Sequence, residues 1–137
     1  MQANAEKTGS IEEARKQFRG LGGTVSILGL ISLFFLGDAG EGLAMATLAA
    51  IGLCVAAGVW LVSRPSTAAG VVSGIALLIL GVCDLALSGE AGGLGLLAPA
   101  IDVGFAIKVF AATGAYARAV RDAAVPATAG LARRIGA

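Results

Sequence analysis

The sequence predicts an all-α membrane protein with four transmembrane helices arranged as two helical hairpins. The 137 residues are 57% hydrophobic and 14% charged, whereas an ordinary soluble domain has roughly 25% charged residues. Only seven charged residues fall between positions 21 and 117. Polar breaks divide this region into four apolar runs, each close to the roughly 20 residues that a helix needs to cross the hydrocarbon core.

Residues 1–20 form a cytoplasmic arm with a helical pattern of its own. Ser10 and Glu13 match a capping box, and apolar residues then recur at helical spacing up to Leu21. We predict a short N-terminal amphipathic helix on the inner membrane surface, with three basic side chains toward anionic headgroups, namely Arg15, Lys16 and Arg19. A direct continuation of the first span into the cytoplasm fits the same pattern.

The transmembrane domain is predicted to cover residues 21–117, with spans at 21–36, 43–63, 67–87 and 94–117. The first span is short unless a flanking glycine is included. The fourth span has an alternative start: Pro99 could break it, which would make residues 94–98 a separate lead-in, Pro99 the first helical residue and Asp102 part of the first turn.

The basic cytoplasmic tail, residues 118–137, contributes Arg118 and Arg121 to the membrane surface. Pro126 and Gly130 interrupt its helical pattern, so we expect it to fray beyond Ala124. The tail and the arm differ from the four apolar runs because they are rich in charged residues.

The distribution of basic residues predicts the orientation. Nine of the ten Lys and Arg residues lie in the arm, in the break at Arg64 or in the tail, and none lies in the first or third break. Four spans place these three regions on one side, and the positive-inside rule makes that side the cytoplasm. We therefore predict a multi-pass protein of the plasma membrane, specifically a bacterial inner membrane, with both termini cytoplasmic.

Small residues on the spans predict close helix packing. The candidates are Gly22 and Ser26 in the first span, Gly42, Ala46 and Ala50 in the second, and Gly70 and Gly74 in the third. They could serve packing within one bundle or docking on another subunit, and their abundance favours some partner contact. The similarity of "GTVS" at 23–26 to "GVVS" at 70–73 suggests tandem hairpins, although chance produces such matches in Gly- and Val-rich sequence.

The residue inventory gives little support for catalysis. The chain has no His, which removes the usual general base and the usual haem ligand. Cys54 and Cys83 stand singly in apolar runs, and no phosphate-binding or nucleophile motif occurs. We expect no enzyme activity, no cofactor, no metal and no nucleic-acid partner. The expected partners are the lipid bilayer and other membrane subunits or copies of the chain.

Three charges inside the spans, Asp84, Asp102 and Lys108, are the best indication of function. Each Asp or Lys near the bilayer centre opposes insertion by about 2.5–3.5 kcal/mol, so such residues find partners in a bundle interior or line a polar path. Asp102 and Lys108 are about 240° apart around one helix, so a neighbouring helix or subunit would have to join them. We predict a polar cluster of the three residues.

Two functions follow from this cluster. The first is an accessory or assembly subunit that acts through helix–helix contacts in a larger membrane complex or homo-oligomer. The alternative is an oligomeric proton-coupled small-solute transporter or ion channel that uses Asp84, Asp102 and Lys108. The sequence names no partner and no solute.

Overall fold

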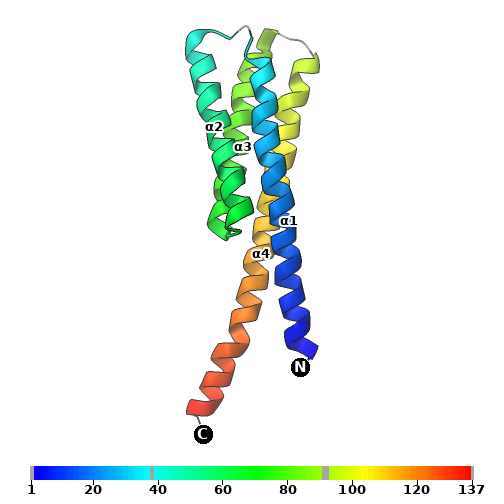
Figure 1. The fold of residues 1–137 in the computed structure, drawn as a ribbon, viewed down its shortest axis with the longest axis vertical. Coiled ribbons are helices and arrows are strands. Elements are labelled where there is room, and N and C mark those ends of the chain that lie inside the picture. Colours follow the sequence, from blue (N-terminus) through cyan, green and yellow to red (C-terminus); the bar gives the residue numbers. More distant parts are fainter. Residues whose placement is uncertain (1, 38, 91–92, 137) are drawn as a thin grey trace.

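The computed structural model is all-helical in the part of the chain that it describes, residues 2–37, 39–90 and 93–136 (Figure 1). The long helices are α1 (Gln2–Ser32), α2 (Glu41–Ser63), α3 (Thr67–Leu87) and α4 (Leu97–Ile135), and the short 3-10 segments are η1 (Leu33–Phe35), η2 (Ser88–Glu90) and η3 (Gly93–Leu96). Each long helix contains a stretch that is long and apolar enough to span a membrane. The chain is therefore a multi-pass membrane protein.

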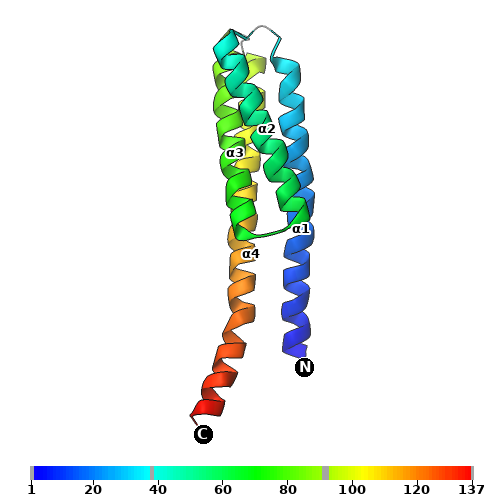
Figure 2. The same cartoon turned by 60° about the vertical axis from the view of Figure 1, so that its left-hand side comes forward.

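The four helices pack side by side in one elongated bundle (Figures 1 and 2). The most extensive packing is between α3 and α4 and between α1 and α2, and further contacts join α2 to α3 and α1 to α4. Both chain ends and the α2–α3 turn lie toward the same end of the bundle, which we call the terminal end. The opposite end, where α1 leads to α2 and α3 leads to α4, is called the loop end.

The helix boundaries at the α2–α3 turn follow from local chemistry. Pro65 cannot continue a helix without losing a backbone hydrogen bond, and α2 ends just before it at Ser63. Ser66 then caps α3, because its side chain accepts a hydrogen bond from the Ala69 amide at 3.2 Å. This cap satisfies one of the free amides at the start of α3.

The N-terminal arm is not a separate helix on the membrane surface, contrary to the first of the two predictions for it. Helix α1 runs unbroken through the arm and the first span. Phe18 is fully buried, and its ring centroid lies 5.0 Å from that of Tyr116 on α4. The apolar stripe of the arm therefore covers the bundle rather than lipid headgroups, while Arg15, Lys16 and Arg19 remain exposed.

Helix α4 differs from its prediction at both ends. It begins at Leu97, two residues before Pro99, since a proline in the first turn gives up no intrahelical hydrogen bond. Asp102 consequently lies in the second turn rather than the first. At the other end α4 continues to Ile135 instead of fraying beyond Ala124, in keeping with the high helix propensity of its many alanines.

Several charged residues of the arm, the breaks and the tail lie outside what the structure describes. Arg118 and Arg121 are exposed on α4 at the terminal end. Asp38 lies outside the described residues, as do the side chains of Lys7, Glu90, Arg133 and Arg134. The predicted orientation therefore continues to rest on the sequence.

Most of the predicted small residues pack inside the bundle. A Cβ atom placed on Gly22 would lie 2.7 Å from the Gly58 carbonyl oxygen of α2, so α1 and α2 approach closely only without side chains there. On α3, a Cβ on Gly70 would collide with Thr113 of α4, and one on Gly74 would lie 2.6 Å from the Phe110 ring. These three glycines therefore pack against helices of the same chain, not against another subunit.

The α2 candidates divide between the interior and the surface. Ala50 is buried, whereas Gly42 and Ala46 are exposed. The serines of the two similar segments both contact α2, since Ser26 Oγ lies 3.5 Å from the Val55 carbonyl oxygen and Ser73 Oγ lies 3.2 Å from that of Ala57. Tandem hairpins would place these serines against equivalent helices, so these contacts give no support to the suggested repeat.

Candidate functional site

Two of the three intramembrane charges meet inside the bundle. Asp84 of α3 and Asp102 of α4 are 4% and 3% exposed, and their side chains line the same cavity, close enough for the carboxyl groups to interact. A Cβ on Gly81 would lie 3.3 Å from the Asp102 Cβ atom. The missing side chain at Gly81 thus lets α4 approach α3 closely enough for the two carboxyl groups to meet.

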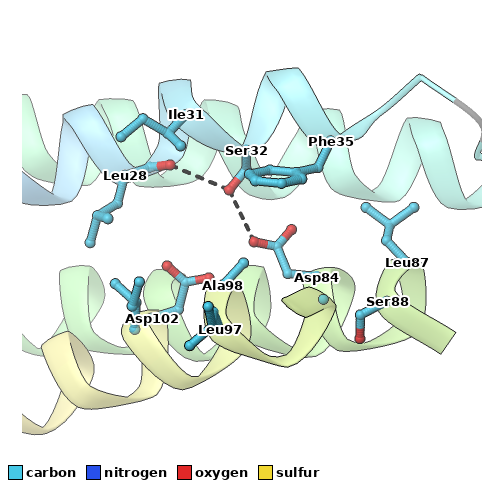
Figure 3. A pocket seen from close by; sticks show the side chains of 12 residues that line it. Leu28, Ile31, Ser32, Phe35, Asp84, Leu87, Ser88, Leu97, Ala98 and Asp102 are labelled. Atoms are coloured by element: carbon cyan, nitrogen blue, oxygen red, sulfur yellow. Dashed lines mark hydrogen bonds between the residues drawn. The ribbon is translucent and has the colours of Figure 1, made fainter. Parts of the chain in front are cut away.

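Helix α1 contributes a third polar group, Ser32, which the sequence reasoning missed. Ser32 Oγ lies 3.1 Å from Asp84 Oδ2 and 3.3 Å from the Leu28 carbonyl oxygen, and only 3% of the residue is exposed (Figure 3). The signal in the sequence was a hydroxyl in the last helical turn of the first span, at the same end as the two aspartates. Ser32, Asp84 and Asp102 therefore bring polar groups from three helices together.

Two buried carboxyl oxygens of this group have no hydrogen-bond partner. They are Asp84 Oδ1 and Asp102 Oδ2. A buried oxygen that accepts no hydrogen bond forfeits about 1–3 kcal/mol, and more if it is charged. The arrangement therefore has unused capacity to accept hydrogen bonds or to hold positive charge.

The aspartates line a cavity of about 350 Å³ between α1 and the α3–α4 pair, near the loop end. Apart from Asp84, Asp102, Ser32 and Ser88, its walls are apolar side chains and Gly95, and none of the described residues that line it is basic. Figure 3 shows both carboxyl groups on the side of α3 and α4 that faces α1. The site is an apolar cavity with an acidic patch in one wall.

Lys108 is not brought to the aspartates. It is exposed, and its Nζ atom lies 5.4 Å from the centroid of the Phe105 ring on its own helix. The α4 residues that pack inward include Asp102, Ala106 and Val109, and Lys108 lies outside that stripe. The predicted three-residue cluster is thus reduced to an aspartate pair, with Lys108 apart from it.

The two cysteines are free thiols within the helices. Cys54 is buried in the core and Cys83 is half-buried beside it. Neither lines the cavity. Their contacts are those of small apolar residues.

The terminal end of the bundle is closed by packing. Phe18, Leu61 and Tyr116 are buried together there, and the Tyr116 hydroxyl donates to the Pro65 carbonyl oxygen at 3.3 Å. The cavity and this packed cluster therefore lie at opposite ends of the core.

Comparison with known proteins adds no further assignment. No family model, curated protein or solved structure gives a significant match to the chain. The functional conclusion therefore depends on the two charged features described above, the aspartate-lined cavity and the exposed lysine.

Proposed function

We propose that this chain is an accessory subunit that assembles with a different membrane protein through the outer face of α4. We define this face by its exposed residues Ala100, Gly104, Ile107, Lys108, Ala111 and Ala115. The observation that carries the proposal is a lysine exposed on the surface of a membrane-spanning helix.

Lys108 lies near mid-depth in the bundle. Gly70, Gly74 and Gly81 of α3 lie against Thr113, Phe110 and Asp102 of α4, and this antiparallel register places Lys108 level with residues 75–76. These residues are close to the midpoint of α3, which has 21 residues. At 1.5 Å per residue, this level is about 12–14 Å from the start of α3 and about 17–18 Å from its end.

A lysine at this depth cannot reach water by extending its side chain. The four-carbon stem spans only about 6 Å, about half of the distance to the nearer end of α3. The contact with Phe105 supplies about 0.5–2 kcal/mol, whereas a lysine at the centre of a span costs about 2.5–3.5 kcal/mol. A carboxylate from another helix would supply the missing stabilisation.

The residues around Lys108 suit a helix as the partner. Ala100, Gly104, Ala111 and Ala115 are small, and a Cβ on Gly104 would meet nothing within 4 Å. In lipid, small residues permit close backbone approach and gain dispersion contact. The outer face of α4 therefore combines a flat surface with one central charge, which suits a helix with an Asp or Glu at mid-depth.

A second copy of the chain fits this face poorly. A two-fold symmetric contact would place the same face on both subunits, and so would bring two Lys108 side chains together. Asp84 and Asp102, the acidic side chains that the structure describes within the spans, are buried. The missing carboxylate is therefore best supplied by a different protein, which favours a heteromeric complex over the homo-oligomer.

The alternative function, a proton-coupled transporter or channel that uses all three charges, has weaker support. Asp84 and Asp102 line a cavity at the loop end, whereas Lys108 is exposed at mid-depth. The buried cluster of Phe18, Leu61 and Tyr116 fills the terminal end. A path through this bundle would have to open that packing.

The finer topology is part of the proposal. We assign both termini to the cytoplasm, the helices to two hairpins and the protein to a bacterial inner membrane, on the basis of the basic arm and tail. Reporter fusions at Gly40, Ser66, Gly89 and Ala137 should read outside, inside, outside and inside. An outside reading at Ala137 would contradict the assignment.

The assembly proposal can be tested with a photo-crosslinking amino acid in native membranes. It is placed at Ile107 on the outer face of α4 and, as a matched control, at Ile75 on α3, which is also exposed and lies at almost the same depth. We expect a discrete adduct from position 107 alone. Its crosslinked segment should be a transmembrane helix with a carboxylate at mid-depth.

The charge is tested in the same assay. Lys108→Leu should lower the adduct yield at least about tenfold, because it strands the partner's carboxylate. Lys108→Asp together with a lysine in place of that carboxylate should restore the adduct. An adduct at twice the mass of the chain, equal yields at both positions, or no effect of Lys108→Leu would contradict the proposal, as would ion flux through liposomes that contain this chain alone.

A further inference from the structure

We infer that the cavity between α1, α3 and α4 is a binding site for an amphiphilic primary ammonium compound, with the nitrogen at Asp84 and Asp102 and the apolar body along the cavity wall. This site is distinct from the outer face of α4. The inference concerns a ligand of the chain itself and does not depend on the proposed partner protein.

The charge of the ligand follows from the acidic pair. Asp84 and Asp102 are more than nine-tenths buried, and no described basic residue lines their cavity. Two neighbouring carboxyl groups repel one another when both are ionised. A cation in the cavity beside both groups would offset that repulsion.

The hydrogen-bonding character of the ligand follows from the two oxygens without partners. Asp84 Oδ1 and Asp102 Oδ2 are buried acceptors that receive no hydrogen bond, whereas Asp84 Oδ2 is already served by Ser32. A primary ammonium group carries three N–H donors, and a turn of each carboxyl group about its Cβ–Cγ bond would bring both acceptors to it. A quaternary ammonium has the charge but no donor.

The apolar body of the ligand follows from the rest of the wall and from its rim. Leu28 and Leu87 lie in the wall, and the rim residues Ile31 on α1 and Ile101 on α4 are 44% and 46% exposed. The cavity is therefore reached from the outer surface between α1 and α4, which in a membrane is hydrocarbon. About 350 Å³ falls in the range of small-molecule sites.

The depth of the acidic pair also suits an amphiphile. Asp84 lies three residues from the end of α3, or about 5 Å along the helix axis. Asp102 lies at the level of Gly81, about 9 Å from the same end. A ligand that enters from the lipid would place its ammonium a short distance below the interface and its chain deeper.

The amine could belong to a free single-chain compound or to a lipid headgroup. A phosphatidylethanolamine headgroup carries a phosphate beside its ammonium, and the carboxylates would repel that phosphate. The shared chemistry is a primary ammonium on an apolar chain. The experiment separates the two sources by the composition of the vesicles.

The test uses the whole purified chain in phosphatidylcholine nanodiscs, with decylammonium as the probe and calorimetric titration as the readout. Decyltrimethylammonium keeps the charge and the chain but lacks N–H donors, and decanol lacks the charge. We expect saturable binding of decylammonium that is about 10- to 100-fold tighter than that of either control, the range expected for charge-assisted hydrogen bonds.

Variants locate the binding. Asp84→Asn with Asp102→Asn should abolish the difference between decylammonium and decanol, and Asp102→Asn alone should reduce it if the double variant does not fold. Glu41→Gln, which removes an exposed carboxylate at the loop end, should leave binding unchanged. Lys108→Leu should also leave it unchanged, so failure of this inference is distinguishable from failure of the assembly proposal.

The remaining outcomes decide between sources or overturn the inference. Displacement of decylammonium by nanodiscs that contain phosphatidylethanolamine would assign the site to a lipid headgroup, and its absence to a free amine. Equal binding of decylammonium and decanol to the native chain would overturn the inference. So would unchanged binding in the Asp102→Asn chain, or no binding of any amine.

Discussion

Helix α4 presents one charge to the interior of the bundle and another to its surface. Asp102 on the inner face meets Asp84, within a group that Ser32 completes, whereas Lys108 on the outer face contacts only Phe105 of its own helix among the interactions that the structure describes. The inner face is also packed against glycines of α3, whereas Gly104 on the outer face is uncovered. The comparison shows that two charges six residues apart on one helix face different surroundings, one inside the bundle and one on its surface.

The largest expected effect tests whether the inner face of α4 is more tightly packed than its outer face. In Gly70→Ala, the new Cβ would collide with the buried Thr113 on the inner face of α4, so α3 and α4 must separate. We expect the free energy of unfolding to fall by about 1–3 kcal/mol. Reversible denaturation of the protein in an uncharged detergent measures it.

Gly114→Ala is the matched control, since it lies beside Thr113 in sequence but a Cβ there meets nothing within 4 Å. It should leave the stability within about 0.5 kcal/mol, or raise it slightly through helix propensity. Equal losses in the two variants would mean that the faces of α4 are not distinguished by packing.

A somewhat smaller effect tests whether α1 takes part in the inner polar group. Ser32→Ala removes the hydroxyl that lies 3.1 Å from Asp84 Oδ2, and should lower the free energy of unfolding by about 1–2 kcal/mol because a buried acceptor is left without a donor. Ser63→Ala removes an exposed hydroxyl that bonds only within its own helix, and should change it by less than about 0.5 kcal/mol. If Ser32→Ala lowers the free energy of unfolding no more than Ser63→Ala does, α1 takes no part in the site.

The smallest expected effect is the coupling between the two charges of α4. Because Asp102 and Lys108 share no partner, the stability changes of Asp102→Asn and Lys108→Gln should add to within about 0.5 kcal/mol in the double variant. The free energies of unfolding of the native chain, both single variants and the double variant give the coupling. A coupling of 1 kcal/mol or more would show that the two side chains interact after all.

The sequence was sufficient for the fold class because long uncharged runs have few structural solutions. The four spans and the close approach at Gly22, Gly70 and Gly74 follow from hydropathy and from residue size. The path of the arm did not follow, because an amphipathic stripe suits a membrane surface and a helix bundle equally well. Only the bundle offers Tyr116 as a contact for Phe18.

The candidate site was predictable only in part. The sequence predicted that Asp84, Asp102 and Lys108 belong to one polar cluster, but the rotation of α4 about its axis is set by packing against α3, which no local pattern encodes. That rotation turns Asp102 inward and leaves Lys108 outside. Ser32 was missed because a hydroxyl in a span commonly bonds to its own helix, as Ser63 does.

The proposed docking face is tested most directly by measuring which side of α4 faces lipid. Nitroxide labels are placed one at a time on two sets of positions, 104, 107 and 111 on the outer face and 106, 109 and 112 on the inner face. The sample is the purified chain in lipid nanodiscs, with its native cysteines replaced. Electron paramagnetic resonance then measures how often each label collides with oxygen. We predict high oxygen accessibility at 104, 107 and 111, characteristic of lipid at mid-depth, and low accessibility at 106, 109 and 112. The opposite phase, with 106, 109 and 112 accessible and the first set protected, would turn Lys108 toward the interior and contradict the proposed docking face.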